Sequence, residues 1–100
     1  MIKLNGESVT LDKVADFAHN NSLAHIEIQL QSGPIKEVGI NGVQIDDVVE
    51  LVRNIIEGFN MDYPCRENSI VITKLDEALL WLLKRKMDRE KRGVEGTHAK

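Results

Sequence analysis

The sequence contains few of the residues that cross-link, kink or stack a small domain. Its 100 residues include one cysteine, two prolines and only four aromatic side chains. A single cysteine excludes an intrachain disulfide and is typical of proteins in reducing compartments. No apolar run approaches the roughly 18 residues of a membrane span, and no signal-peptide pattern opens the chain. We therefore expect a soluble, intracellular protein.

Patterns that carry catalysis or bind metals are also scarce. The three histidines lie in separate segments, without the i+3 or i+4 spacing of metal ligands. There is no glycine-rich phosphate loop, and Ser69 and Thr73 have no evident base nearby. Cys65 lies where a helix dipole can lower a thiol pKa, but a buried structural cysteine is the more common role. The sequence predicts no metal, no cofactor and no enzyme.

The length and the 42% hydrophobic content suit one domain, residues 1–100. Three parts follow one another in it: a strand-rich part over 1–42, a helical hairpin over 43–93 and a loose tail over 94–100. No repeat or low-complexity linker separates them. The predicted class is α+β, in which a small N-terminal antiparallel sheet with a short helix precedes a C-terminal helical hairpin.

The strand-rich part begins with an Asn-Gly pair at 5–6 between two short extended runs, which predicts a β-hairpin. Helical spacing then predicts a short helix over 11–21. Residues 23–31 alternate between apolar and polar side chains, which indicates a strand with one buried face. A Gly-Pro pair at 33–34 predicts a turn, and 35–40 is the expected return strand.

The helical part should begin at Asp46, which can cap a first helix. This helix has one main apolar stripe and a second beside it: Val49, Val52, Ile56 and Phe59, flanked by Val48, Leu51 and Ile55. Pro64 breaks the pattern, after which a long second helix runs to about Arg92 and stops at Gly93.

The second helix has more apolar surface than one small sheet can cover. Residues at three-four spacing form one stripe: Ile72, Leu75, Leu79 and Leu82. Further apolar residues extend this stripe around the helix: Val71, Ala78, Trp81, Leu80 and Leu83. A helix that is apolar nearly all round needs more than one neighbour. We therefore predict at least a dimer.

The end of this helix is basic, although the net charge of the chain is −3. Residues 84–100 contain seven Lys or Arg and three Asp or Glu. Arg85 and Arg89 are four residues apart and share a helix face, so their guanidinium groups can grip a phosphate or pyrophosphate. The alternative is a solvated arginine face paired with Asp88 and Glu90.

Four segments carry a resemblance to a known family: "NGVQIDDVVELV", "GFN", "CRENSIVITKLDEALLWL" and "DREKRGVEGTH". Over residues 41–98 the chain resembles the phage Thoeris anti-defence proteins, sponges whose helical hairpin is related to that of phage anti-CBASS sponges. The resemblance implies a protein of the host bacterial cytoplasm that binds the cyclic ADP-ribose isomer made in Thoeris immunity and holds it intact. Some relatives form hexamers, as trimers of dimers, and bind cyclic oligonucleotides at separate sites.

The family's ligand contacts correspond here to Phe59, Asn68, Arg85 and Arg89. Tyr63 is an alternative to Phe59 as the stacking ring, because the turn varies in length. From the apolar stripe alone, Phe59 would instead be a core residue. Asn68 and Arg85 are seventeen residues apart, about 25 Å along a straight helix, so two antiparallel helices from different subunits must meet to complete one pocket.

Three other functions are compatible with these residues. An enzyme that degrades a nucleotide signal would have the same pocket but would release an altered ligand. A small nucleic-acid-binding regulator would use the basic helix end, with weak and strongly salt-dependent binding because the rest of the chain is acidic. The third is a structural oligomer without a ligand.

Overall fold

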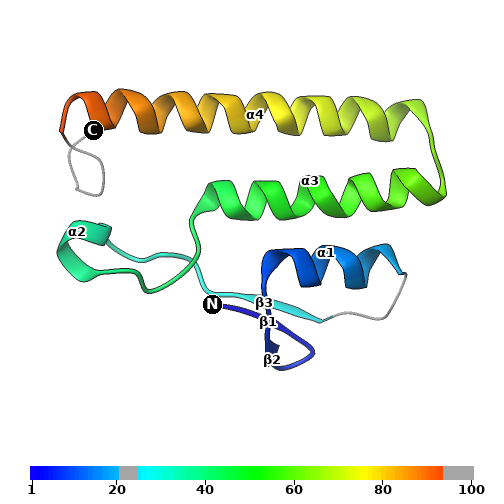
Figure 1. The fold of residues 1–100 in the computed structure, drawn as a ribbon, viewed down its shortest axis with the longest axis horizontal. Coiled ribbons are helices and arrows are strands. Elements are labelled where there is room, and N and C mark those ends of the chain that lie inside the picture. Colours follow the sequence, from blue (N-terminus) through cyan, green and yellow to red (C-terminus); the bar gives the residue numbers. More distant parts are fainter. Residues whose placement is uncertain (21–24, 94–100) are drawn as a thin grey trace.

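The computed structural model describes residues 1–20 and 25–93 (Figure 1). The predicted α+β class is confirmed, with a small antiparallel sheet followed by helices. The predicted tail over 94–100 lies outside the described residues. In chain order the elements are β1 (Ile2–Leu4), β2 (Glu7–Ser8), α1 (Leu11–His19), β3 (Ile26–Ile28), α2 (Ile35–Val38), α3 (Ile45–Asp62) and α4 (Arg66–Lys91).

The described strands form one antiparallel sheet in the order β2-β1-β3. The predicted hairpin between β1 and β2 is confirmed: Asn5 and Gly6 both have positive φ, 51° and 89°, which these two residue types tolerate best. On its other side β1 pairs with β3, with Ile2 opposite Ile28. The Asn5 side chain also accepts a hydrogen bond from the His25 backbone N–H at 2.9 Å, which fastens the hairpin to the start of β3.

The core lies where the sheet, α1 and α3 meet. Ile2 of β1, Val14 of α1 and Leu51 of α3 are buried against one another. Five half-buried residues pack around them: Val9, Leu11, Ile28, Val43 and Ile55. Figure 1 shows α3 between α1 and α4, so α3 connects the strand-rich part to the long helix.

The predicted return strand over 35–40 is wrong, because this segment forms the single helical turn α2. Pro34 has φ fixed near the helical value and precedes the turn, while Gly33 and Gly39, with φ of 83° and 77°, bend the chain on either side. The chain does return toward β3, but through a parallel bridge between Leu30 and Val43.

Side-chain amides close the loop that this bridge creates, residues 31–42. The Gln31 amide nitrogen donates to the carbonyls of Gly33 and Gly39 at 3.1 and 2.8 Å. Its oxygen accepts from the backbone N–H groups of Asn41 and Gly42 at 2.9 and 3.3 Å. The amide therefore ties both ends of the loop together, and backbone groups that a strand would have paired are satisfied instead by this side chain.

The N-cap of α3 lies two residues before the predicted one. Gln44, not Asp46, is the N-cap, and it forms a capping box with Asp47: each side chain binds the backbone N–H of the other residue. The buried face is the secondary stripe, which contains Leu51 and Ile55, rather than the main one, from which Val52 and Phe59 emerge exposed.

Helix α4 begins at an unusual cap. The Sγ atom of Cys65 accepts a hydrogen bond from the Asn68 N–H at 3.4 Å, and the Asn60 side chain accepts one from the Cys65 N–H at 3.0 Å. Cys65 is exposed, so the interpretation as a buried cysteine is wrong. At the other end Gly93, with φ of 72°, follows the last turn, as predicted.

The two long helices are held together by aliphatic packing and one ion pair. The predicted stripe of α4 is half-buried against α3: Ile72, Leu75, Leu79 and Leu82. The Nε atom of Arg53 donates to Asp76 at 2.8 Å, and the same guanidinium pairs with Glu57 on its own helix. The hydrogen bond to Asp76 raises the pKa of Arg53 above its usual value.

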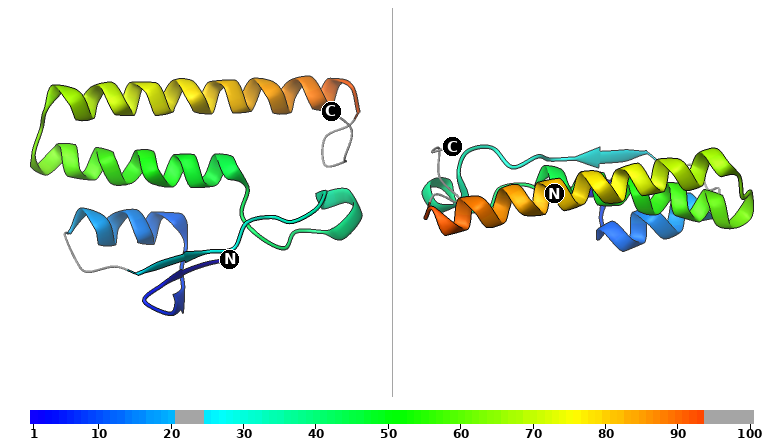
Figure 2. Two further views of the ribbon diagram at one scale, coloured as in Figure 1. Left: turned by 180° about the vertical axis from the view of Figure 1, so that it is seen from behind. Right: turned by 90° about the horizontal axis from the view of Figure 1, so that it is seen from above.

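The elements form a thin slab, 44 × 32 × 13 Å along its principal axes (Figure 2). Helix α4 lies along its outer edge, supported mainly by α3. Apolar side chains of α4 therefore remain exposed: Ile70, Val71, Leu80, Trp81, Leu83 and Met87. Of the helices described, none combines the length and apolarity needed to cross a membrane.

Candidate functional site

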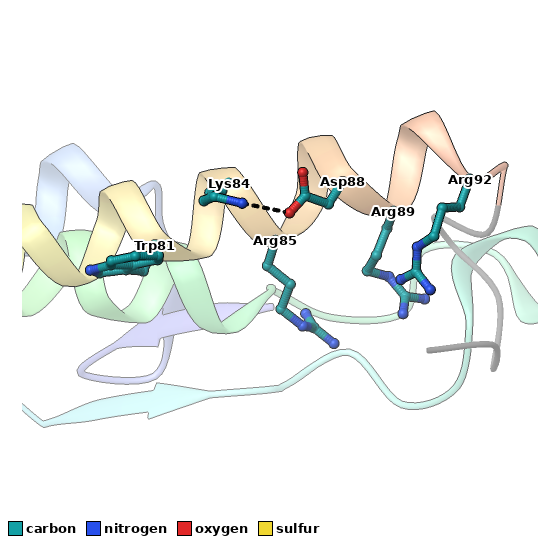
Figure 3. Close-up of a pocket in the computed structure, with 6 residues that line it drawn as sticks. All are labelled: Trp81, Lys84, Arg85, Asp88, Arg89 and Arg92. Carbon is teal, nitrogen blue, oxygen red and sulfur yellow. Dashed lines mark hydrogen bonds and ion pairs between the residues drawn. The ribbon is translucent and has the colours of Figure 1, made fainter.

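The C-terminal half of α4 carries a hollow of about 490 Å³, which we call the arginine pocket (Figure 3). Its described lining comes from α4 and the C-cap of that helix: Trp81, Lys84, Arg85, Asp88, Arg89 and Arg92. The predicted pair, Arg85 and Arg89, does lie together, and Figure 3 shows both side chains leaving the same side of α4 with Arg92.

Local sequence explains why these groups converge. Helix α4 has no glycine or proline from Arg66 to Lys91, so it stays continuous. Positions four apart differ by only about 40° around such a helix and by about 6 Å along it. Trp81, Arg85 and Arg89 therefore form one row along a single face. Regular helix geometry alone brings the ring and the two guanidinium groups together.

The arginine pocket is strongly cationic, with four basic side chains and one carboxylate. That carboxylate, Asp88, accepts a hydrogen bond from Lys84 at 2.8 Å. This bond lowers the pKa of Asp88 below its usual value, so the group is ionised at neutral pH. The lining consequently has a formal charge of +3, which suits a ligand with more than one negative charge.

The two predicted arginines differ in exposure. Arg85 is exposed, whereas Arg89 is only 8% exposed, the one buried charged residue among those described. Both also line a second hollow of about 390 Å³, the loop pocket, on the side of the α2 loop. Its other walls are mainly apolar: Leu30, Gln31, Gly33, Pro34, Ile35, Val43, Gln44 and Ile45. Both arginines thus border two hollows, and Arg85 is the exposed one of the pair.

The other predicted site residues lie at the far end of the hairpin. Asn68 is in the first turn of α4, and Phe59 is in the last turn of α3. Phe59 is 39% exposed, so the interpretation as a core residue is wrong, and Tyr63 at the end of α3 is 72% exposed. Because α4 is one unbroken helix, Asn68 and Arg85 remain about 25 Å apart within the chain.

Sequence reasoning missed Trp81 as a site residue, since it expected this ring to widen the apolar stripe. The ring is 65% exposed and lines the arginine pocket instead. The signal was present, because Trp81 stands four residues before Arg85 and eight before Arg89. Among the described residues, no cluster of His, Cys, Asp and Glu side chains is suited to a metal ion.

Comparison with known proteins shows the family. A family model described as "Acb2/Tad1, hairpin domain" matches residues 22–86. The chain is also 48% identical, over 97 residues, to "Thoeris anti-defense 1" of Bacillus phage SBSphiJ7. The chain belongs to the Acb2/Tad1 hairpin-domain family. The predicted resemblance is thereby confirmed.

The Acb2/Tad1 hairpin match covers most of the candidate site. It contains Phe59, Asn68, Trp81 and Arg85, while Arg89 lies three residues beyond its end. The alignment to the phage protein includes 96% of this chain but only 63% of that relative. The Acb2/Tad1 chain described here therefore spans less than two thirds of that relative's length.

Proposed function

We propose that this protein counters Thoeris immunity by binding a cyclic ADP-ribose isomer and holding it unchanged. The observation that carries the proposal is the arginine pocket, a cationic hollow with an aromatic ring at one end, on a member of the Acb2/Tad1 family. The name of the phage relative, Thoeris anti-defense 1, indicates the pathway. The ligand chemistry follows from the pocket: guanidinium groups for a pyrophosphate and aromatic rings for a base.

In the proposed complex, two chains build each pocket. Arg85 and Arg89 of one copy bind the pyrophosphate, and Phe59 and Asn68 of the other reach the base and ribose. Two observations support this division. The two groups stand at opposite ends of the helical hairpin, and α4 carries exposed apolar residues along the edge of the thin slab. Antiparallel pairing of two α4 helices would cover apolar surface and create two equivalent pockets.

Sequestration requires tight binding rather than turnover. A sponge competes with an effector that senses the same signal, so nanomolar affinity, about −12 kcal/mol, is the relevant scale. The arginines, Phe59 and Asn68 each have a binding role in this scheme, and none has to activate water. An enzyme of signal degradation would bind the same nucleotide but release a changed product, which separates the two functions experimentally.

Arg85→Ala is the sharpest test, because Arg85 is exposed and its removal leaves the core intact. One lost charge-assisted hydrogen bond costs about 1.5–3 kcal/mol, so affinity for the cyclic ADP-ribose isomer should fall about 10- to 150-fold in calorimetry. Lys86→Ala is the matched control: it removes the same charge at the next position but does not line the arginine pocket. Equal affinity in the two variants would contradict the assignment.

The fate of the ligand tests sequestration against degradation. The protein is incubated with a panel of cyclic ADP-ribose isomers, the free ligand is measured, and the complex is then heated. Recovery of unchanged nucleotide in the bound amount supports sequestration. Recovery of a cleaved product would identify an enzyme instead, and absence of binding across the panel would overturn the proposed function.

A further inference from the structure

We propose that Trp81 stacks on the base of the bound nucleotide, so that the chain which supplies the arginines also supplies an aromatic face. This inference rests on the proposed function and adds a base-recognising residue to the same site. It begins from the position of the ring. Among the described residues that line the arginine pocket, Trp81 is the only aromatic one, and it stands at the end of the row that continues with Arg85 and Arg89.

The indole does not share a helix face with the exposed apolar residues next to it in the sequence. Leu83 is about 200° from Trp81 around the helix, and Met87 about 120°, whereas Arg85 is only about 40° away. Leu83 and Met87 are exposed, so together with Leu80 they form an apolar face directed away from the arginine pocket. Trp81 therefore shares its helix face with charged groups, and its ring borders a hollow that is open to solvent.

The ring is also available. It is 65% exposed, and Figure 3 shows the guanidinium of Arg85 directed away from the indole rather than across its face. The other described residues of the lining are all charged, so among them only the indole offers a flat apolar surface to a base. Arg85 and Arg89 lie about 6 and 12 Å further along the helix, which lets a nucleotide extend from ring to arginines.

The chemistry of the pocket then divides into two parts. The guanidinium row recognises phosphates through charge and hydrogen bonds, which a base-free anion also provides. The indole recognises only the π-face of a base, and such stacking is tolerant of base identity. A ring from the partner copy, Phe59 or Tyr63, can cover the opposite face of the same base. Trp81 should therefore determine the preference for nucleotides over simple pyrophosphate.

The experiment uses the fact that Trp81 is the only tryptophan of the chain, so intrinsic tryptophan fluorescence reports on this ring alone. Wild-type protein is titrated with the panel of cyclic ADP-ribose isomers and with inorganic pyrophosphate. We expect the bound isomer to quench the fluorescence and pyrophosphate to leave it nearly unchanged. Absence of quenching by an isomer that calorimetry shows to be bound would overturn the stacking role.

Variants then separate binding from structure. Trp81→Ala should lower the affinity for the isomer about 5- to 150-fold and leave the affinity for pyrophosphate unchanged. Trp81→Phe should restore part of the lost affinity. Lys86→Ala, an exposed residue of the same helix that does not line the arginine pocket, is the control and should bind like wild type. Equal weakening of both ligands, or loss of the oligomer in Trp81→Ala, would show a structural role and overturn the inference. If the wild-type protein binds no isomer, the proposed function fails as well.

Discussion

Two variants that each bind the ligand weakly should restore wild-type affinity in a fraction of the pockets when they are mixed. Arg85→Ala removes the proposed phosphate-binding group near the end of α4, and Asn68→Ala removes an amide in its first turn. The two positions are about 25 Å apart on one unbroken helix, so no single chain can bring both to one small nucleotide. If each pocket takes Asn68 from one copy and Arg85 from the other, the two defects can fall in the same pocket of a mixed dimer.

The expected amplitude follows from this geometry. A mixed dimer has one pocket with both substitutions and one with neither. Random pairing of equal amounts of the two chains makes about half of all dimers mixed, so about one quarter of all pockets should be intact. The same fraction holds for larger assemblies that are built from such dimers.

The assay is calorimetric titration with the cyclic ADP-ribose isomer that wild-type protein binds. The two chains are unfolded and refolded together so that they exchange partners. Each variant alone should show strongly weakened binding, and the mixture should show wild-type affinity with about one quarter of the wild-type stoichiometry. A mixture that binds no better than the average of its components would refute the shared pocket, provided that size measurements show exchange.

Two further predictions concern the loop and the charge of the arginine pocket. Gly42→Ala should destabilise the fold by about 1–3 kcal/mol in urea unfolding, because the added Cβ would stand 2.5 Å from the backbone carbonyl oxygen of Leu30; an unchanged midpoint would show that the loop yields. Asp88→Asn should strengthen anion binding about two- to five-fold by removing the carboxylate. Lys84 lowers the pKa of Asp88, so the anion affinities of the variant and of wild type should become equal only as the pH falls below that depressed pKa. Equal anion affinities at pH 7 would contradict this account.

Periodicity and turn chemistry predicted most of the elements. The Asn5-Gly6 hairpin, α1 and both long helices follow from local preferences that the tertiary structure does not oppose. The strand prediction for residues 35–40 was wrong because their apolar side chains suit a strand, while Pro34 and the flanking glycines favour a turn. The closing interactions there come from Gln31, whose four hydrogen bonds span eleven residues of sequence and have no local signature.

The candidate site was partly predictable for the same reason. Arg85 and Arg89 needed only helix spacing, because a regular helix fixes which side chains share a face. The exposure of Trp81 and Phe59 was not predictable from the stripe pattern, since an apolar side chain on a helix is buried only if another element covers it. In this slab Trp81 stays 65% exposed and Phe59 39% exposed, because the described elements cover each ring only in part.

The sequence by itself determined the α+β order, the continuous helix α4 and the row of Trp81, Arg85 and Arg89 on one of its faces. These properties depend on residues close together in the chain, for which helix geometry is sufficient. Only the tertiary structure decided which stripe of α3 is buried, how the 31–42 loop closes beside the arginines, and which apolar side chains stay exposed. Those outcomes depend on packing between distant segments, where the relative placement of whole elements decides what each side chain meets.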